Sequence, residues 1–581
     1  MREKRILFIA LVLAMALMQG ALAQATEPQA DLYFENGAVY TVDAQDTVAE
    51  ALAVKDGLIV FVGSAEDGQA YREGAAEVVD LDGGMLLPGL IDGHIHSVTP
   101  DFFDFNLLGI MDVDTMLDTV EAYIAANPDK EAYAGYGYMT SVFEGEELLK
   151  GPRKERLDAI CPDKPLLIYA FDGHAAWANS KCFEASGITR DTPSTPGGQI
   201  VKDDETGELW GTLKDTAMSL LPEVKVNPEK LDSELQGFTA SLNALGYTSI
   251  MTLPGNGFMP LPWEAYARLE DAGLLTMRVR GAGMLTSWKT EEDIADLLEK
   301  KAQYNSELVR LTNAKLFADG VMDSESAHLL EAYADNPENH GATVWEQDAI
   351  NEAVAALNTD GVQAHVHAIG DAAVRMALDA FEYAREHAPE GDYRNVITHL
   401  QLVAPEDFER FAELDAVAVA QPYWHYKEPG YWEPIEYAAL GERAKTEYPM
   451  KSFLDHGVVL AFSSDYPVTA VPNPFVAIER GVTRNLVDGT ASDVPDITDM
   501  DDPTYLLGPE ERLTVREMIR GFTIDAAYSM FTDTVTGSLE TGKSADMIVI
   551  DQDLLTVDPL AISDTRVLRT YFMGQEVFKA E

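Results

Sequence analysis

The stretch that decides the fold is Pro88-Gly89-Leu90-Ile91-Asp92-Gly93-His94-Ile95-His96. It predicts an apolar strand that ends in two histidines spaced i, i+2, and both imidazoles point to one face because side chains alternate along a strand. Imidazole is a preferred ligand of Zn²⁺ and similar ions. His94 and His96 are therefore candidate metal ligands at the end of a strand.

Downstream of this stretch, apolar β-branched runs alternate with helical patterns such as 291–307, 349–357 and 372–387. This alternation is typical of βα units around a buried parallel sheet. Eight candidate strands fit a closed (β/α)8 barrel of the TIM type in an α/β fold. They are 86–95, 247–253, 276–282, 310–317, 361–367, 395–400, 416–421 and 457–464.

Two further candidate strands, 132–138 and 165–171, do not fit a barrel of eight. They lie in a long and irregular stretch from about 97 to 240, which holds a Pro/Gly-rich segment at 192–198. We interpret this stretch as a large insertion after the first barrel strand, within a hydrolase barrel that spans 88–530.

The sequence predicts short strands at both ends of the mature chain. Turn signals separate them, such as Asn36-Gly37 and Asp56-Gly57 in the first part. The first half-module covers 26–87 and the second covers 531–581. We expect these two half-modules at opposite ends of the chain to pair into one small β-sandwich.

The first 25 residues have a different character. Basic residues at Arg2, Lys4 and Arg5 precede the apolar run 6–18, and Ala21-Leu22-Ala23 follows with small residues at signal-peptidase spacing. A run of this length is short against the roughly 20 residues that span a bilayer. The sequence therefore predicts a signal peptide at 1–25, no membrane attachment after its cleavage, and a periplasmic or secreted protein.

Acidic residues outnumber basic ones by 98 to 42, which gives a net charge of −56. Such a charge argues against binding to nucleic acid or to anionic membranes. It suits an acidic surface in a salty medium, where ions screen self-repulsion. The only cysteines are Cys161 and Cys182, and the sequence leaves open whether they form a disulfide.

Further residues of ligand type fall at the ends of later strands: Lys315, His367, His399 and Asp465, on the fourth, fifth, sixth and eighth barrel strands. The carboxyl ends of barrel strands form one mouth, so these side chains are expected to converge with the first histidine pair. Such a set can hold two divalent metal ions with a charge-neutralising bridge between them. His365 lies two residues before His367 and competes with it as a ligand.

Additional motifs are Gly173-His174, Asp319-Gly320, His367-Ala368-Ile369-Gly370-Asp371, Ser464-Asp465-Tyr466-Pro467 and the run from Gly537 to Asp546. With these motifs the chain resembles the amidohydrolase superfamily, particularly the branch that includes N-substituted formamide deformylases (amidohydrolase family 3). The resemblance covers nearly the whole mature chain. One departure is the acidic run after Asp319-Gly320, where relatives tend to have small, neutral residues.

The resemblance implies two metal ions, with zinc as the expected metal, and a Lys315 that CO2 has carboxylated on its amine to bridge them. It assigns His94, His96 and Asp465 to one ion, and His367 and His399 to the other. The position directly before Ala-Ile-Gly-Asp favours His367 over His365. A lysine beside two cations is driven to lose its proton, which is compatible with the modification.

The implied activity is hydrolysis of an amide-type C–N bond in a small molecule, such as a formamide or a linear or cyclic amide, by a hydroxide bound between the metal ions. Asp465 is then a catalytic residue that takes the proton of the hydroxide and passes it to the leaving nitrogen. His174 is implied as a catalytic contact to the oxyanion or to the leaving group. A packed histidine with no contact to substrate is the alternative at that position.

Two other functions remain open. A mononuclear deaminase of the same superfamily does not need the bridging lysine, so Lys315 argues against it. The other is a catalytically silent binding protein on the same scaffold, because fold does not fix function. Such a protein is expected to lose stoichiometric metal. A homodimer is compatible with the sequence, which does not decide the oligomeric state.

Overall fold

The computed structural model describes most of the chain. The described residues are 30–97, 103–171, 173–222, 228–254, 262–492 and 494–581. The expected signal peptide at 1–25 lies outside them. Among the described helices, none has both the length and the apolar character that a membrane span requires.

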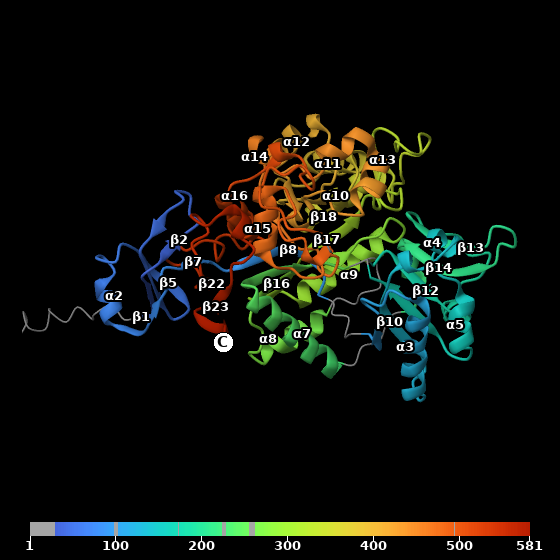
Figure 1. Ribbon diagram of the computed structural model, residues 1–581, viewed down its shortest axis with the longest axis horizontal. Coiled ribbons are helices and arrows are strands. Elements are labelled where there is room, and N and C mark those ends of the chain that lie inside the picture. Colours follow the sequence, from blue (N-terminus) through green and yellow to red (C-terminus); the bar gives the residue numbers. More distant parts are fainter. Residues whose placement is uncertain (1–29, 98–102, 172, 223–227, 255–261, 493) are drawn as a thin grey trace, which may run out of the picture.

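A parallel sheet of eight strands forms the centre of the molecule (Figure 1). The strands pair in the order β21-β20-β19-β18-β17-β16-β15-β8. Their bounds are β8 (Leu90–Ile95), β15 (Tyr247–Thr252), β16 (Arg278–Met284), β17 (Val309–Phe317), β18 (Gln363–Ala368), β19 (Val396–His399), β20 (Val417–Ala420) and β21 (Leu460–Phe462). Most of their residues are buried, as expected for a parallel sheet with a packed interior and covered outer face. The predicted (β/α)8 barrel is confirmed.

The barrel closes where its first and last strands meet. The amide of Asp465 donates to the carbonyl oxygen of His94 at 2.9 Å, and the amide of His96 donates to the carbonyl oxygen of Tyr466 at 2.9 Å. The buried carboxylate of Asp92 accepts one backbone amide from each side of this seam. The seam therefore fixes the register of the two segments that carry three predicted metal ligands.

Helices cover the outer face of the barrel (Figure 1). Three of them confirm the helical patterns in the sequence: α9 (Thr290–Gln303), α10 (Gln347–Thr359) and α11 (Asp371–His387). Others are α7 (Pro228–Ala244), α8 (Trp263–Asp271), α12 (Phe408–Glu413), α14 (Lys451–Asp455), α15 (Pro474–Thr483), α16 (Val515–Gly521) and α17 (Ile524–Ser529). Along α11 the buried residues recur at helical spacing and include many alanines, which let the helix approach the strands closely.

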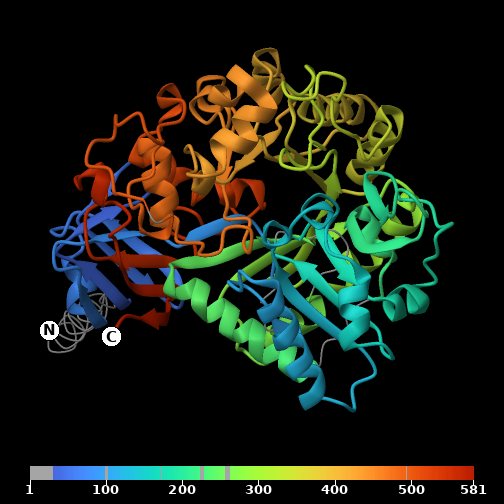
Figure 2. The ribbon, with the colours of Figure 1, turned by 45° about the vertical axis from the view of Figure 1, so that its right-hand side comes forward.

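Two sheets at one end of the molecule combine both ends of the described chain. One sheet has the order β5-β4-β1-β6 and the other has the order β24-β23-β22-β7-β2-β3. The bounds are β1 (Ala30–Glu35), β2 (Ala38–Tyr40), β3 (Val48–Ala49), β4 (Ala51–Lys55), β5 (Leu58–Gly63), β6 (Ala75–Asp80), β7 (Met85–Pro88), β22 (Met547–Ile550), β23 (Val567–Phe572) and β24 (Gln575–Lys579). Figure 2 shows the red strands of the chain end beside the blue strands of its beginning. An apolar core with members from both ends holds them together.

The first predicted barrel strand, 86–95, is in fact two strands. β7 pairs with β2 and β22 in the sandwich, whereas β8 belongs to the barrel. The break falls at Gly89, where a Cβ atom would lie 2.2 Å from the side-chain oxygen of Thr248. Only glycine allows so close a passage, so one apolar run serves both sheets.

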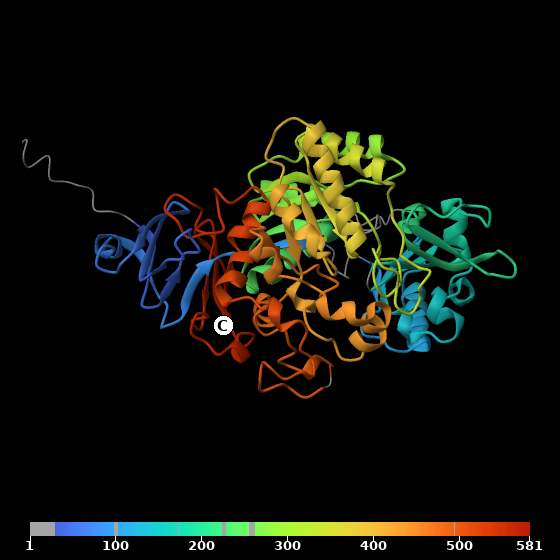
Figure 3. The ribbon, with the colours of Figure 1, turned by 90° about the horizontal axis from the view of Figure 1, so that it is seen from above.

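The insertion between β8 and β15 contains a six-stranded sheet of its own, in the order β13-β14-β12-β11-β10-β9. Its strands are β9 (Phe105–Asn106), β10 (Tyr133–Tyr138), β11 (Leu166–Ala170), β12 (Ala175–Ala178), β13 (Gly198–Lys202) and β14 (Leu209–Asp215). Helices α3 (Val113–Ala126), α5 (Lys154–Ile160) and α6 (Ser180–Ser186) accompany it. The sequence predicted only two of these strands. The inserted module and the sandwich lie at opposite ends of the barrel (Figures 1 and 3).

The two cysteines lie in the inserted module. Cys161 follows α5 and Cys182 is in α6, and both are buried. Both are free thiols in the structure, so the disulfide that the sequence left open is not formed there.

Candidate metal centre

The predicted ligands gather at the carboxyl ends of the barrel strands. They are His94 on β8 and His96 just after it, Lys315 on β17, His367 on β18, His399 on β19 and Asp465 just after β21. Apart from His96, each of them is at most 5% exposed. Side chains from five strands thus share one buried mouth, which is where barrel enzymes place their chemistry.

Asp465 lies between the two histidines of the first strand. Its Oδ1 atom is 3.0 Å from Nε2 of His96 and 3.3 Å from Nε2 of His94. Among the described residues, these three offer ligand atoms that all lie within 4.8 Å of one another. One carboxylate oxygen and two imidazole nitrogens therefore face a common point.

The other ring nitrogen of His96 shows which atom carries its hydrogen. Nδ1 lies 2.8 Å from the carbonyl oxygen of Leu253, which can only accept. In the neutral ring Nδ1 is therefore the donor, and Nε2 presents a lone pair to the carboxylate of Asp465. Two lone pairs that face each other repel unless a cation lies between them.

His399 and His367 are oriented in the same way by acceptors outside the cluster. Nδ1 of His399 lies 3.1 Å from Oε1 of Gln421, and Nε2 of His367 lies 3.1 Å from the carbonyl oxygen of Gly320. The two rings contact each other with centroids 4.6 Å apart. A hydrogen bond from one ring nitrogen to a protein acceptor is the usual way to orient a metal-binding imidazole, because it leaves the second nitrogen free to bind.

The electrostatics of the cluster keep its ligands in the forms that bind metal. Burial lowers the pKa of His94 and His399 well below the usual range and that of His367 to about 3, so these rings stay neutral. Neutral imidazoles around a carboxylate are a donor set that fits a divalent ion such as zinc.

Lys315 lies beside this cluster and is 1% exposed. Its Nζ atom is 3.4 Å from Nε2 of His94 and lies 4.7 Å from the centre of the Phe317 ring. Burial lowers the pKa of Lys315 to about 7, against an opposing effect of Asp465. A large share of this amine is therefore neutral and nucleophilic near neutral pH.

The two histidines of β18 have different neighbours. His365 lies behind His94, with its Nε2 atom 3.0 Å from Nδ1 of that ring. His367 instead packs against His399 and, with ring centroids 4.9 Å apart, against Phe317. The structure thus brings both residues to the site: His365 contacts His94, and His367 lies beside His399.

The buried carboxylate of Asp319, to which the sequence assigned no role, holds the turn that follows His367. Asp319 accepts hydrogen bonds from the amides of His328, Ile369 and Gly370 at 2.8 to 3.0 Å. These bonds tie the turn after β18 to the loop after β17. Burial raises the pKa of Asp319 to about 7, although the three amides oppose this shift.

His174 approaches the centre from the inserted module. It lies just before β12, and it lines a small, partly open cavity together with Asp319 and Gly320 of the barrel. Its Nδ1 atom is 2.8 Å from Oδ1 of Asp215 at the end of β14. Sequence reasoning missed Asp215, because the two residues are 41 positions apart and no local motif joins them.

Comparison with known proteins identifies the family. A model of the Amidohydrolase family matches residues 77–578. Protein LONG AFTER FAR-RED 3 of Arabidopsis thaliana is 30% identical over 564 residues, which cover 94% of this chain and 92% of the relative. N-substituted formamide deformylase of Arthrobacter pascens is 25% identical over 564 residues, which cover 94% of this chain and 97% of the relative.

A solved structure extends the likeness to three dimensions. The crystal structure of an uncharacterized metal-dependent hydrolase from Pyrococcus furiosus superposes with a TM-score of 0.65 at 25% sequence identity, over 90% of this chain and 100% of that chain. It agrees with the barrel fold of this chain. By the span of the family match and the identity of its relatives, this chain belongs to the amidohydrolase family and is a metal-dependent hydrolase that acts on carbon–nitrogen bonds.

Proposed function

We propose that the protein hydrolyses the C–N bond of an amide-type small molecule, either a formamide or a linear or cyclic amide, with two divalent ions at the barrel mouth. The observation that carries this proposal is the Asp465 carboxylate aimed at the Nε2 atoms of His94 and His96. That arrangement suits a bound cation, and it leaves a carboxylate beside the point where a substrate carbonyl would be held. The formamide deformylase among the relatives supports the amide class.

Each ligand has a place in the proposal. One ion would be held by His94, His96 and Asp465, and the other by His367 and His399. Zinc is the proposed metal, because imidazole-rich sites with a carboxylate suit it. When bound, such ions lower the pKa of water enough to supply hydroxide near neutral pH and polarise a carbonyl group.

We further propose that Lys315 carries a carboxylate group. Its neutral amine would attack the carbon of CO2, form one N–C bond and release one proton, and this turns a cationic side chain into an anionic carbamate. The anion would bridge the two ions and offset their charge. Deep burial of Lys315, with Nζ 3.4 Å from the neutral ring of His94, supports an amine that is available for this step.

Two side chains would move protons during hydrolysis. Asp465 would take a proton from the attacking water and transfer it to the leaving nitrogen, a task for a carboxylate that faces the reaction point. His174, held through Nδ1 by Asp215, would contact the carbonyl oxygen or the leaving group with its other ring nitrogen. His174 is one of the residues that line the cavity beside the centre, which supports this placement.

Export is a separate proposal. The basic and apolar pattern of residues 1–25 supports cleavage of a signal peptide and a periplasmic or secreted mature protein. N-terminal sequencing of the protein from a native-like host tests it. A mature chain that begins near residue 26 agrees with export, and an intact Met1 contradicts it.

Metal analysis of the purified protein tests the central proposal. About two equivalents of zinc per chain are expected, with fewer in Lys315→Ala and Asp465→Asn and no change in Lys445→Ala, a control at an exposed lysine. Reconstitution of the apoprotein should also be faster with added bicarbonate in the wild type but not in Lys315→Ala. One equivalent that is indifferent to Lys315 would instead support a mononuclear hydrolase or deaminase, and none would favour a silent binding protein.

A further inference from the structure

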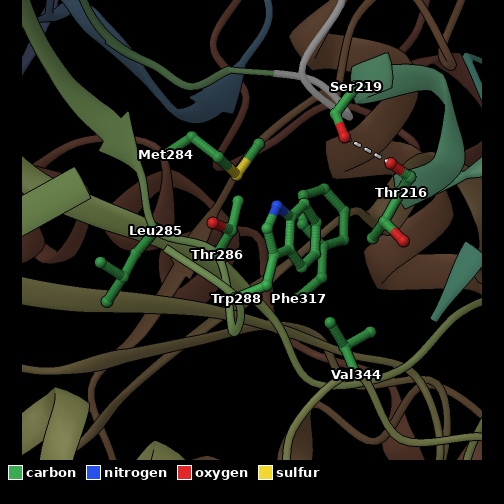
Figure 4. A pocket seen from close by; sticks show the side chains of 8 residues that line it. All are labelled: Thr216, Ser219, Met284, Leu285, Thr286, Trp288, Phe317 and Val344. Carbon is green, nitrogen blue, oxygen red and sulfur yellow. Dashed lines mark hydrogen bonds between the residues drawn. The ribbon is translucent and has the colours of Figure 1, made fainter. Parts of the chain in front are cut away.

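A partly open pocket lies between the inserted module and the barrel. Thr216 and Ser219 contribute to it from the insertion, and Met284, Trp288, Phe317 and Val344 contribute from the barrel and its loops. Figure 4 shows the Met284 thioether and the Trp288 and Phe317 rings turned toward the same space. Two parts of the chain that are far apart in sequence thus build one pocket.

The hydroxyl groups that line this pocket are occupied elsewhere. Ser219 donates to the carbonyl oxygen of Thr216 at 2.7 Å, and Thr216 donates to the carbonyl oxygen of Pro196 at 2.6 Å. Thr286 donates to the carboxylate of Asp293 at the start of α9. Of the described residues that line the pocket, none is charged. The surface offered to a ligand is therefore mainly carbon, and burial of apolar groups there is favourable.

The pocket continues toward the candidate metal centre. It shares Thr216, Phe317 and Val344 with the smaller cavity that His174 and Asp215 line. Phe317 also contacts the candidate metal centre, because its ring lies beside Lys315 and His367. A ligand whose apolar group fills the first cavity would extend its polar part through the second, toward the ligands of the metal.

We propose that this pocket binds one apolar substituent of the amide substrate, the size of a phenyl ring or a branched alkyl chain, and so selects the substrate. The ligand is a substrate only under the amide hydrolysis proposed above, but its binding to the pocket can be tested without turnover. Charged substituents are excluded because they would lose hydration without gaining a partner. The substituent is on the amide nitrogen or on the acyl carbon, and these two cases are separated below.

The test fills the pocket at Ser219, an exposed position at its rim. In the Ser219→Phe variant the new ring occupies the space of the substituent. Ser233→Phe is a matched control, because Ser233 is exposed on α7 and also donates to a carbonyl oxygen three residues earlier, that of Lys230. A fold defect from the phenylalanine itself should appear in both variants.

Turnover provides the first readout. Two series of substrates are compared. The first varies the group on nitrogen and contains N-methyl, N-isobutyl and N-phenylethyl formamide. The second varies the group on the acyl carbon and contains N-methylacetamide and N-methyl-isovaleramide. Wild type and Ser233→Phe should prefer the larger member of one series by roughly tenfold or more in kcat/KM, the usual discrimination of an apolar pocket. Ser219→Phe should lose that preference. The series in which the preference occurs shows whether the substituent is on nitrogen or on carbon. Equal preference in all three proteins overturns the proposal.

Binding provides a readout that needs no turnover. Trp288 lines the pocket, so benzyl alcohol should change the tryptophan fluorescence of wild type and Ser233→Phe in a saturable way, and should not do so in Ser219→Phe or Trp288→Phe. Binding without hydrolysis of any amide would retain the pocket and refute the proposed reaction. Hydrolysis of amides without size preference and without benzyl alcohol binding would retain the proposed reaction and refute the pocket.

Discussion

The backbone amide of Asp465 donates to the carbonyl oxygen of His94 at 2.9 Å, across the seam that closes the barrel. The same two residues bring a carboxylate oxygen and an imidazole nitrogen to within 3.3 Å of each other. The backbone contact sets the side-chain contact, because a bond between neighbouring strand ends fixes where both side chains start. Fold closure and site geometry are therefore one feature of this chain.

This relationship predicts that Asp465→Asn is inactive but folded. Asp465 has a φ of 54°, a region that asparagine also adopts, and the seam depends on its backbone amide. Loss of the proton acceptor should lower kcat about 10²- to 10⁴-fold. Steady-state kinetics on an amide substrate measure the loss, and the thermal midpoint of the metal-free protein should stay near that of metal-free Asp455→Asn, a surface control. A variant with more than a tenth of wild-type kcat would remove Asp465 from the proposed proton transfer.

Gln421 should control metal affinity through His399. Its Oε1 atom faces Nδ1 of His399 at 3.1 Å, while its amide nitrogen donates to the hydroxyl of Ser463 at 2.8 Å. Gln421→Leu removes the acceptor at similar volume and should weaken the affinity of one bound ion about 10- to 100-fold. Gln421→Glu keeps an acceptor and should retain more of the affinity. Competition with a chelator measures both, and equal losses would point to packing rather than orientation.

Much of the barrel could be predicted because its signals are local. A buried strand needs a run of apolar residues, and a ligand such as Lys315 or Asp465 at its end stands out against that run. The fold class and the helices α9, α10 and α11 followed from such patterns. The break at Gly89 did not, because it depends on the close approach of Thr248, a residue distant in sequence.

The inserted sheet and the contacts around the metal centre lacked local signals. β12 has four residues, Ala-Ala-Trp-Ala, and acquires its identity as a strand from antiparallel pairing with β11 and β14. Leu253 and Gly320 orient histidines through backbone carbonyl groups, which every residue possesses. Sequence patterns identify side chains with unusual chemistry, but they do not show which ordinary carbonyl group will face them.

Asp215 should act by positioning His174. Its carboxylate oxygen lies 2.8 Å from Nδ1, so in the neutral ring the hydrogen is on that nitrogen. Asp215→Asn keeps the volume of the side chain but weakens control of the tautomer and orientation of the ring. We expect kcat to fall while KM changes little. Asp204→Asn, at an exposed site in the same module, is the control. A kcat equal to that of the wild type would leave Asp215 a purely structural role.

A pair of buried glutamates near the barrel mouth should make stability depend on pH. Gln401 donates through its amide nitrogen to Glu436 at 3.0 Å and to Glu447 at 2.6 Å. Burial raises the pKa of Glu436 from its ordinary value of 4.5 to about 8, and burial together with Glu436 raises that of Glu447 well above its usual range. The folded state therefore holds protons that the unfolded chain releases at lower pH.

The sign of the effect follows from proton linkage. Between about pH 4.5 and 8 the folded state binds more protons than the unfolded chain, so the free energy of unfolding falls as the pH rises through this range. Glu436→Gln imitates the protonated acid and removes the charge that acts on Glu447, so its stability should fall less over the same range. Urea unfolding at pH 5, 6, 7 and 8 compares it with wild type and with Glu433→Gln, an exposed control on the same helical segment. Since only a buried pair couples folding to these protons, the control should follow the wild type. Parallel curves for all three proteins would show that the pair is ionised in the folded state at every pH tested.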